Sequence, residues 1–488
     1  MAQTLWNMSV MEIKKIERLS APAKASFVLM LTQLIQKGLA VITTPIFTRL
    51  LTTAEYGQVS VFFSWYEILV IFSGFCLSKG VFNNGMLDYK DDRDCFSLSL
   101  YSLSLLISLV VGSCIIIFSK YVWNFMNLPM NLIVFMVLLL TLEEAFSIWS
   151  VRQRFEYKYK ALALVTVGLA VISPIVGIIC VLKYKENAVV ARICGERTVF
   201  LLTYLFVIIY LLVKAKGKIK LRYWKYAVLF NLPLIPHYLS LHILNHMDRI
   251  QIEWIVGSSA AGIYAVAYSG ASVVKIVWQS INASLIPWTY EKCKKEEFDK
   301  LGEMTKILVT GYGIVCLGFM FVAPEIMRIL APSSYIEGVA VIPSVVSGVF
   351  FSSLYYIFAN VVYYYKKPTY VMIGSIASAL LNVILNAIFI PRFGFVVAGF
   401  TTMISYMLQS VMDYYAMYKL TGKSIYDMKH ILCISVVFII CSITLNLVYQ
   451  NMVLRICLFM ALLSYMLYYC KNNLRKTIQF LKGKGKNK

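Results

Sequence analysis

Charged residues are scarce in this chain, and their scarcity argues against a soluble protein. Of its 488 residues only 14% are charged, whereas 60% are hydrophobic and the mean hydropathy is +0.73. The polar stretches between the apolar runs are too short to fold alone. This composition excludes a large soluble domain and most soluble chemistry.

Signatures of metal, disulfide and nucleotide chemistry are also missing. The eleven cysteines are scattered, without a CxxC pair or a Cys/His ligand spacing, so we predict neither a disulfide nor zinc. No Gly-rich phosphate loop appears, so ATP hydrolysis is not expected. Asp92 and Asp94 form an acid-x-acid pattern that resembles glycosyltransferase metal–nucleotide sites, but no nucleotide-binding fold accompanies it. We expect a solvated acidic loop there, no enzyme activity and no cofactor.

Long apolar runs fill the chain instead. A run of about 20 apolar residues spans the hydrocarbon core of a bilayer, which is roughly 30 Å thick. Such segments must be helices, because lipid offers no partner for unsatisfied backbone groups, and the runs lack the alternation of a β-barrel. We therefore predict an all-α polytopic membrane protein with about 14 transmembrane helices. The expected spans are residues 26–44, 58–79, 96–119, 131–150, 161–182, 198–213, 227–247, 254–280, 303–323, 339–363, 370–390, 395–418, 430–449 and 452–470.

The basic residues predict the orientation of these spans. With the N-terminus inside, 33 of the 46 lysines and arginines fall in cytoplasmic segments, 10 in external segments and three within spans. This bias satisfies the positive-inside rule and places both termini in the cytoplasm. The net charge of +22 is then a topology signal facing anionic lipid, and no nucleic-acid partner is predicted.

Two related halves are expected. The first and seventh spans each end in an external arginine, Arg49 or Arg249, followed by a short connection to Gly57 or Gly262, where we expect a tight turn. This similarity predicts parallel six-helix repeats followed by two extra helices. The expected parts are an amphipathic interfacial segment at 1–25, an N-lobe at 26–213, a basic linker at 214–226, a C-lobe at 227–418, the last two helices at 419–471 and a basic tail at 472–488.

Three strings make the resemblance specific: IFTRLLTTAEYG, MDRIQIEWIVGSSAAGIYAVAYS and NVILNAIFIPRFGFVVAGFTTMISY. They resemble signatures of the bacterial polysaccharide transporters, the flippases of O-antigen and capsule repeat units. That family belongs to the multidrug/oligosaccharidyl-lipid/polysaccharide exporter superfamily. The third string is the strongest match, through Asn382, Asn386, Pro391, Gly394 and Gly399.

The resemblance implies two lobes around a central cavity and a location in the bacterial cytoplasmic membrane. It implies that an undecaprenyl-diphosphate-linked oligosaccharide moves from the inner to the outer leaflet for O-antigen, capsule or exopolysaccharide assembly. A polysaccharide polymerase and a chain-length regulator are expected partners, besides the membrane lipids. A multidrug exporter and a flippase of the peptidoglycan precursor lipid II stay open as alternatives, and a membrane glycan polymerase or ligase is the weakest one.

Ionisable residues inside a membrane cost roughly 2.5–3.5 kcal/mol each on insertion scales, so they are candidate functional residues. Three lysines qualify, Lys37, Lys79 and Lys275, and Gln33 lies one turn before Lys37. In a water-filled cavity these four residues suit an anionic head group, because lysine binds phosphate as a point charge. The competing interpretation is that Lys79 and Lys275 extend to the cytoplasmic interface.

Acidic residues and one histidine are candidates for coupling. Glu67, Glu143, Glu144 and Asp413 lie within predicted spans and either form buried ion pairs or carry protons. His237 lies in the seventh span. Coupling to protons, to sodium or to the membrane potential is expected in place of ATP.

Four further residues are candidates for gating. Arg49 with Glu55, and Asp248 with Arg249, are predicted as pairs at the ends of loops that brace the external side.

Overall fold

The computed structural model describes residues 21–465, with side chains from Val28 onward. Throughout this range the regular secondary structure is helical, so the predicted all-α polytopic fold is confirmed. The basic tail predicted at 472–488 lies outside the described residues, as does the segment predicted at 1–25 except for its last five residues. The two ends of the chain are therefore not part of the fold described below.

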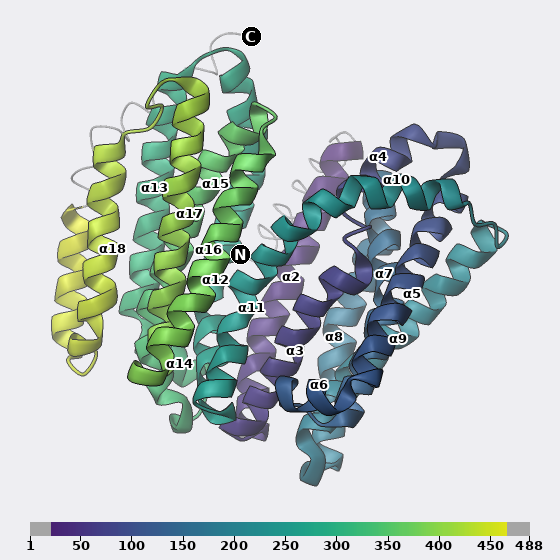
Figure 1. The fold of residues 1–488 in the computed structure, drawn as a ribbon. Coiled ribbons are helices and arrows are strands. Elements are labelled where there is room, and N and C mark those ends of the chain that lie inside the picture. Colours follow the sequence, from purple (N-terminus) through teal and green to yellow (C-terminus); the bar gives the residue numbers. More distant parts are fainter. Residues whose placement is uncertain (1–20, 466–488) are drawn as a thin grey trace, which may run out of the picture. The chain divides into compact units, whose positions relative to one another are not determined.

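The predicted spans fall on helices, several of which are longer than the spans. Figure 1 shows these helices along the chain. The long ones are α2 (Ala21–Leu50), α3 (Thr53–Gly74), α5 (Arg93–Ile117), α7 (Met130–Phe155), α8 (Tyr159–Lys183), α9 (Ala188–Lys214), α11 (Ile235–Ile255), α12 (Ser258–Lys294), α13 (Phe298–Phe321), α15 (Ile342–Tyr364), α16 (Pro368–Phe393), α17 (Val397–Thr421) and α18 (Met428–Val448). Short helices join them: α4 (Gly80–Asp88), α6 (Ser119–Met126), α10 (Leu221–Asn231), α14 (Ala323–Leu330) and the 3₁₀ segment η4 (Ser333–Val341).

Eleven helical stretches of the described chain are long and apolar enough to cross a membrane. α3 and α17 have 22 and 25 residues but are less apolar, and a shorter apolar helix covers Met452–Tyr465. Each of the fourteen predicted spans thus overlaps a helix, while the count of fourteen membrane crossings stays a prediction.

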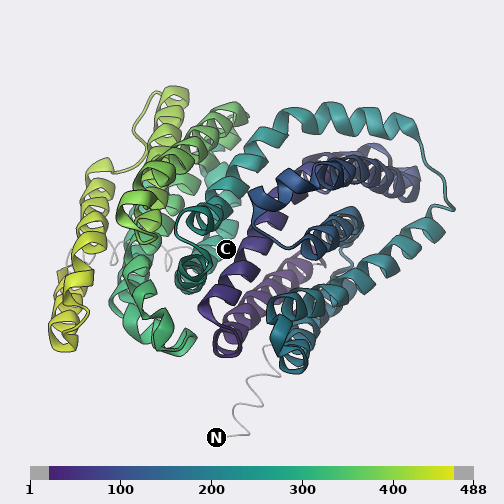
Figure 2. The ribbon, with the colours of Figure 1, turned by 60° about the horizontal axis from the view of Figure 1, so that its bottom comes forward.

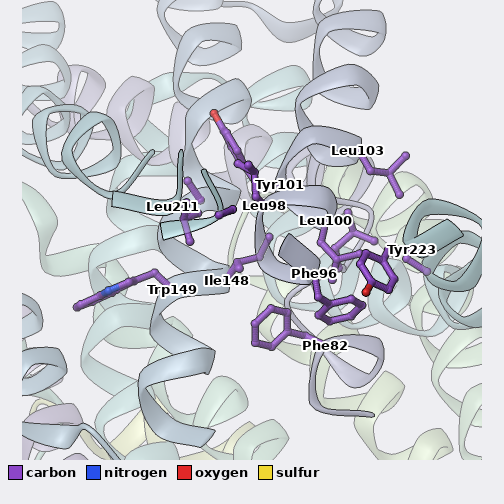
Figure 3. Packing of buried hydrophobic residues seen from close by; sticks show 14 of the residues in the cluster. Phe82, Phe96, Leu98, Leu100, Tyr101, Leu103, Ile148, Trp149, Leu211 and Tyr223 are labelled. Atoms are coloured by element: carbon purple, nitrogen blue, oxygen red, sulfur yellow. The ribbon is translucent and has the colours of Figure 1, made fainter. Parts of the chain in front are cut away.

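The chain forms two compact units. Among the described residues, the first comprises 21–43 and 65–235, and its helices α5, α7, α8 and α9 pack against one another. Its buried core includes a cluster of aromatic side chains from α4, α5 and α10 (Figure 3). The ring of Phe96 lies 5.9 Å from Phe82 and 5.2 Å from Tyr223, between ring centroids. This cluster fixes the short helix α4 against the long helix α5.

The second unit comprises, among the described residues, 44–64 and 236–465, and is built around α15. This helix packs against α12, α13, α17 and α18, and nearly all of its apolar stretch is buried. Small residues allow the close approach, since a Cβ on Gly399 would lie 2.2 Å from the Ser344 hydroxyl oxygen. α18 lies at the margin of this unit (Figures 1 and 2).

Residues 44–64 bring the end of α2 and the start of α3 into the second unit. There Gly57 and Gly262 lie inside α3 and α12, so the tight turns predicted at these glycines are wrong. The two glycines face each other: a Cβ on Gly57 would lie 1.8 Å from the Ser258 carbonyl oxygen, and one on Gly262 would lie 2.1 Å from that of Thr53. Glycine is needed here because two backbones touch.

The positions matched by the predicted internal repeat therefore lie in contact. The lobe boundaries at 213–227 and at 418 stay predictions.

Candidate functional site

Several ionisable residues of the first unit lie near a break between two helices. α3 ends at Gly74, and α4 begins only at Gly80. Between them Phe75 and Cys76 have left-handed backbone conformations, with φ of 49° and 54°. Non-helical backbone at membrane depth persists only where protein buries it or water reaches it, and broken helices mark binding sites in transporters.

Two buried polar side chains satisfy the open backbone at this break. The Asn231 amide at the end of α10 donates to the carbonyl oxygens of Phe75, at 3.0 Å, and Cys76, at 2.8 Å. The carboxylate of Glu144 on α7 accepts from the backbone N–H of Ser78 at 2.7 Å. Asn231 is fully buried and Glu144 is 5% exposed. Buried side chains therefore stabilise the break as part of the folded unit.

Charges of both signs surround the break. Lys79 immediately precedes α4, within electrostatic range of Glu67 and Glu144. A Cβ on Gly74 would lie 2.8 Å from the Glu144 Oε2, so a larger residue there would displace the carboxylate. The structure therefore brings together three of the predicted residues, Lys79, Glu67 and Glu144, within one unit.

Arg197 completes this group, and the sequence analysis missed it. It was assigned to an external loop, but α9 begins at Ala188 and carries Arg197 about 14 Å along its axis. Its guanidinium lies 5.2 Å from the ring centroid of Tyr66, whose hydroxyl donates to Glu143. The adjacent charges Glu196 and Arg197 at the edge of an apolar run were the sequence signal, and the nearby Lys183 and Lys185 made this stretch resemble a loop.

Lys37 and Gln33 lie apart from the break, on α2. Lys37 is half-buried and Gln33 is exposed. Both occupy the part of α2 that belongs to the first unit. Their predicted role in substrate binding stays a prediction.

In the second unit, Asp248 is the centre of a buried hydrogen-bond network. Its Oδ1 accepts from Asn386 at 2.7 Å, and its Oδ2 accepts from Tyr264 and Thr402, both at 2.7 Å. Asn386 also reaches Gln251 at 3.1 Å. These residues come from α11, α12, α16 and α17, so the network ties four helices together.

The predicted pairing of Asp248 with Arg249 at a loop end is wrong, because both lie within α11. Asp248 is only 1% exposed, and its neighbour points elsewhere. The guanidinium of Arg249 lies 4.5 Å from the ring centroid of Tyr268 and donates to the Asn245 carbonyl oxygen at 2.9 Å. A polar residue close to an expected span end was misassigned to a loop because α11 continues to Ile255.

The predicted pair of Arg49 and Glu55 is also not formed. Arg49 donates to the carbonyl oxygen of Pro45 at 2.8 Å, whereas Glu55 accepts from the backbone N–H of Thr52 at 2.8 Å. The Thr52 hydroxyl accepts in return from the N–H of Glu55 at 3.2 Å. This reciprocal arrangement is a capping box at the start of α3. The T-x-x-E spacing indicates such a box, which was not among the predictions.

Lys275 and His237 make packing contacts within the second unit. The Lys275 ammonium donates to the Asn245 side-chain oxygen at 2.8 Å and is half-buried. His237 Nδ1 lies 2.9 Å from the Ser375 hydroxyl, which joins α11 to α16. The contact of His237 agrees with a structural role for this histidine, while its predicted role in coupling stays a prediction.

The acidic side chains of Asp92 and Asp94 are partly exposed, as expected, but both also form ion pairs. Lys220 and Tyr223 both donate to Asp92, and Asp94 forms a 2.6 Å ion pair with Arg152. Both aspartates already have cationic partners from other elements. These contacts connect α5, α7 and α10, and they do not form a metal–nucleotide site.

Comparisons with known proteins agree with this architecture. The family model described as "Polysaccharide biosynthesis protein" matches residues 23–291, more than half of the chain. A curated relative, the Lsg locus putative protein 1 of Haemophilus influenzae, is 38% identical over 72 residues. That alignment covers 15% of this chain and 18% of the relative, so the chain spans less than a fifth of the curated relative that it matches.

Solved structures show the fold. The lipid II flippase MurJ in an inward closed conformation has a TM-score of 0.62 at 14% identity, covering 92% of this chain and all of that one. An inward-facing multidrug resistance MATE family transporter of the MOP superfamily has a TM-score of 0.57 at 12% identity, covering 79% of this chain and 95% of that one.

Those proteins are named as a flippase and a transporter, and the family and fold support a transporter rather than an enzyme, as predicted. The long apolar helices and these relatives support a multi-pass membrane protein. The chain belongs to the polysaccharide biosynthesis protein family and has the helical fold of the MurJ and MATE transporters.

Proposed function

We propose that this protein is a flippase that moves an undecaprenyl-diphosphate-linked oligosaccharide from the inner to the outer leaflet of the bacterial cytoplasmic membrane. Membership of the polysaccharide biosynthesis family is the observation that carries the proposal. The fold similarity to a lipid II flippase supports it, because that protein also acts on a lipid. The product would be a repeat unit for O-antigen, capsule or exopolysaccharide.

The basic residues supply the chemistry for an anionic head group. Lys37, Lys79 and Lys275, with Gln33, are the proposed substrate-binding residues. Lys79 is the best supported, because it lies at a helix break, where backbone and side chain can both face a ligand. Lys275 is half-buried on α12 and donates a hydrogen bond to the side-chain oxygen of Asn245.

Transport proceeds by alternating access in this proposal. The diphosphate and sugar enter a cavity while the prenyl tail stays in lipid. Outward movement of negative charge is favoured by about 2.3 kcal/mol per charge per 100 mV, so the membrane potential supplies a driving force without ATP. Glu67, Glu143, Glu144 and His237 are the proposed coupling residues, and Arg49, Glu55, Asp248 and Arg249 the proposed gating residues.

A gene deletion tests the function in cells. Cells that lack this protein should accumulate the lipid-linked repeat unit on the inner leaflet and lose surface polysaccharide, and the wild-type gene should restore both. Surface polysaccharide at the normal level, with no accumulation of the precursor, would contradict the proposal. Because a polymerase and a chain-length regulator are the proposed partners, their deletion should instead leave single repeat units on the outer leaflet.

Flipping of lipid II is the second candidate, because the lipid II flippase fold covers 92% of this chain. The same cells distinguish the two functions. A lipid II flippase would be required for peptidoglycan synthesis, and its depletion would cause lysis, whereas loss of a repeat-unit flippase changes the cell surface only. Multidrug export is disfavoured by the intramembrane lysines, since cationic drugs prefer carboxylates.

A further inference from the structure

One face of α17 carries a continuous row of buried polar side chains. Thr402, Tyr406, Gln409 and Asp413 follow one another at intervals of four, three and four residues, which places them on one side of a helix. Their exposed fractions are 1%, 6%, 0% and 0%. The row is about 16 Å long. Buried polar groups in a membrane-spanning helix are costly, and they mark ion and proton pathways.

The first half of this row is fully hydrogen-bonded. Thr402 donates to Asp248 at 2.7 Å. Tyr406 donates to the side-chain oxygen of Asn245 at 3.3 Å, and Lys275 donates to the same oxygen at 2.8 Å. This half therefore has the character of a structural network.

The second half differs. Both side-chain polar atoms of Gln409 and both carboxyl oxygens of Asp413 are buried without a hydrogen-bond partner among the described residues. On α16, Gly374 lies next to Asp413, because a Cβ on this glycine would lie 3.6 Å from Oδ1 of the carboxyl group. An ionised carboxylate without a donor is strongly disfavoured in such surroundings. A carboxylic acid, which carries its own proton, is tolerated there.

Other titratable groups around Asp413 supply no opposite charge. From α15, Tyr355 and Tyr363 lie within electrostatic range, and Tyr238 of α11 is near Tyr363. On α16, Ser375 next to Gly374 is held by His237 of α11. η4 also packs against α17, and its titratable residues are Tyr335 and Glu337.

No lysine or arginine forms an ion pair with Asp413 in the described part of the chain. A proton is therefore the counter-charge that the site can take.

We propose that Asp413 is a proton-binding site of the second unit, with Gln409 as its polar neighbour, and that it releases its proton in another conformation of the transport cycle. In that conformation the proton passes from one carboxyl oxygen to a water molecule as the carboxylate forms. The coupling to transport rests on the proposed function, whereas proton binding by Asp413 does not.

Infrared difference spectroscopy of the full-length protein in proteoliposomes tests proton binding directly. At neutral pH, wild type minus Asp413→Asn should show the carbonyl band of a protonated carboxylic acid, and wild type minus Asp91→Asn should not. Asp91 is an exposed aspartate and serves as the matched control. Asp413→Ser is the second variant in case the asparagine variant fails to fold, as judged by size-exclusion chromatography.

Absence of the band at neutral pH, or its loss when sodium is added at constant pH, would overturn the proposal. A transport assay adds the second readout. Asp413→Asn should abolish the dependence of translocation on the pH gradient, and Asp413→Glu should retain it. If no translocation of the lipid-linked oligosaccharide is found for wild type, the proposed function fails, while the infrared result still decides whether Asp413 binds a proton.

Discussion

Single polar residues hold this membrane protein together at places where its helices are interrupted. Asn231 and Glu144 replace the hydrogen bonds that the backbone loses between α3 and α4. An unsatisfied buried group costs about 1–3 kcal/mol, so each of these side chains matters for stability. The same break places Lys79 beside two carboxylates, which joins the stability of the unit to its proposed chemistry.

Replacement of Asn231 tests this role. Asn231→Leu leaves the buried carbonyl oxygen of Phe75 without a donor and removes one of the two donors to that of Cys76, which still accepts from the Lys79 N–H. The variant should therefore destabilise the protein by about 1–3 kcal/mol. Thermal unfolding of the detergent-solubilised protein measures the change. Asn83→Leu is the control, because Asn83 is exposed on the neighbouring helix α4. Equal melting temperatures for the two variants would show that Asn231 does not support the break.

A second residue gives a pH prediction at the junction of α12 and α13. Hydrogen bonds from Lys292 and Lys300 lower the pKa of the Glu297 carboxyl to about 2, from an ordinary value of 4.5. A lowered folded-state pKa contributes stability above pH 4.5, and this contribution is lost as the pH falls toward 2. Glu297→Gln should therefore melt below wild type at pH 6, and the difference should shrink by pH 3.

The exposed Glu303 on α13 offers a control for this comparison. Glu303→Gln should leave the melting temperature nearly unchanged at both pH values. A difference between wild type and Glu297→Gln that stays constant from pH 6 to pH 3 would rule out the ionised carboxylate as its cause.

At the scale of elements, the sequence predicts the long helices well and the contacts between them poorly. Length and hydropathy suffice for the spans, because a bilayer requires about 20 apolar residues in a helix. The same criteria placed Arg197 and Asp248 in or near loops, because a charged residue near a span end looks like a boundary. Only the packing of α9 and α11 shows that both residues lie inside helices.

The glycine contact between α3 and α12 shows a second limit of sequence reasoning. The repeat correctly singled out Gly57 and Gly262, but a single chain does not reveal which helices cross at them. The sequence also did not reveal that Gln409 and Asp413 are buried on one side of α17. Their burial depends on the packing of α15 and α16 against that side. Their spacing of four residues was a readable signal that they share a face.

Gly57→Ala tests the crossing of α3 and α12. Its methyl group would lie 1.8 Å from the Ser258 carbonyl oxygen, so the two helices must separate. Overpacking of this kind costs about 1–3 kcal/mol, and we expect a lower melting temperature together with impaired transport. Gly311→Ala in α13 is the matched control, since nothing lies within 4 Å of the added methyl group. A melting temperature of Gly57→Ala equal to that of wild type would contradict the observed contact.

In the whole molecule, the basic residues between the helices and the ionisable residues within them have different roles. The excess of basic residues in the predicted cytoplasmic segments fixes orientation, whereas the few ionisable residues within the helices have no such role. In the first unit several of them lie near a broken helix. In the second, Asp248 is the centre of a hydrogen-bond network, whereas the carboxyl group of Asp413 has no hydrogen-bond partner among the described residues. Ionisable residues within a membrane carry a free-energy cost. We therefore assign both arrangements to transport rather than to folding.

Translocation of an undecaprenyl-diphosphate-linked oligosaccharide by the purified protein in proteoliposomes is the most direct test. Wild-type protein should move the labelled lipid across the bilayer. Lys37→Ala, Lys79→Ala and Lys275→Ala should each slow the movement at least about tenfold, equivalent to roughly 1.4 kcal/mol, while the corresponding arginine variants keep most of it. No movement with wild type, or wild-type rates in all three alanine variants, would contradict a cationic path for the diphosphate.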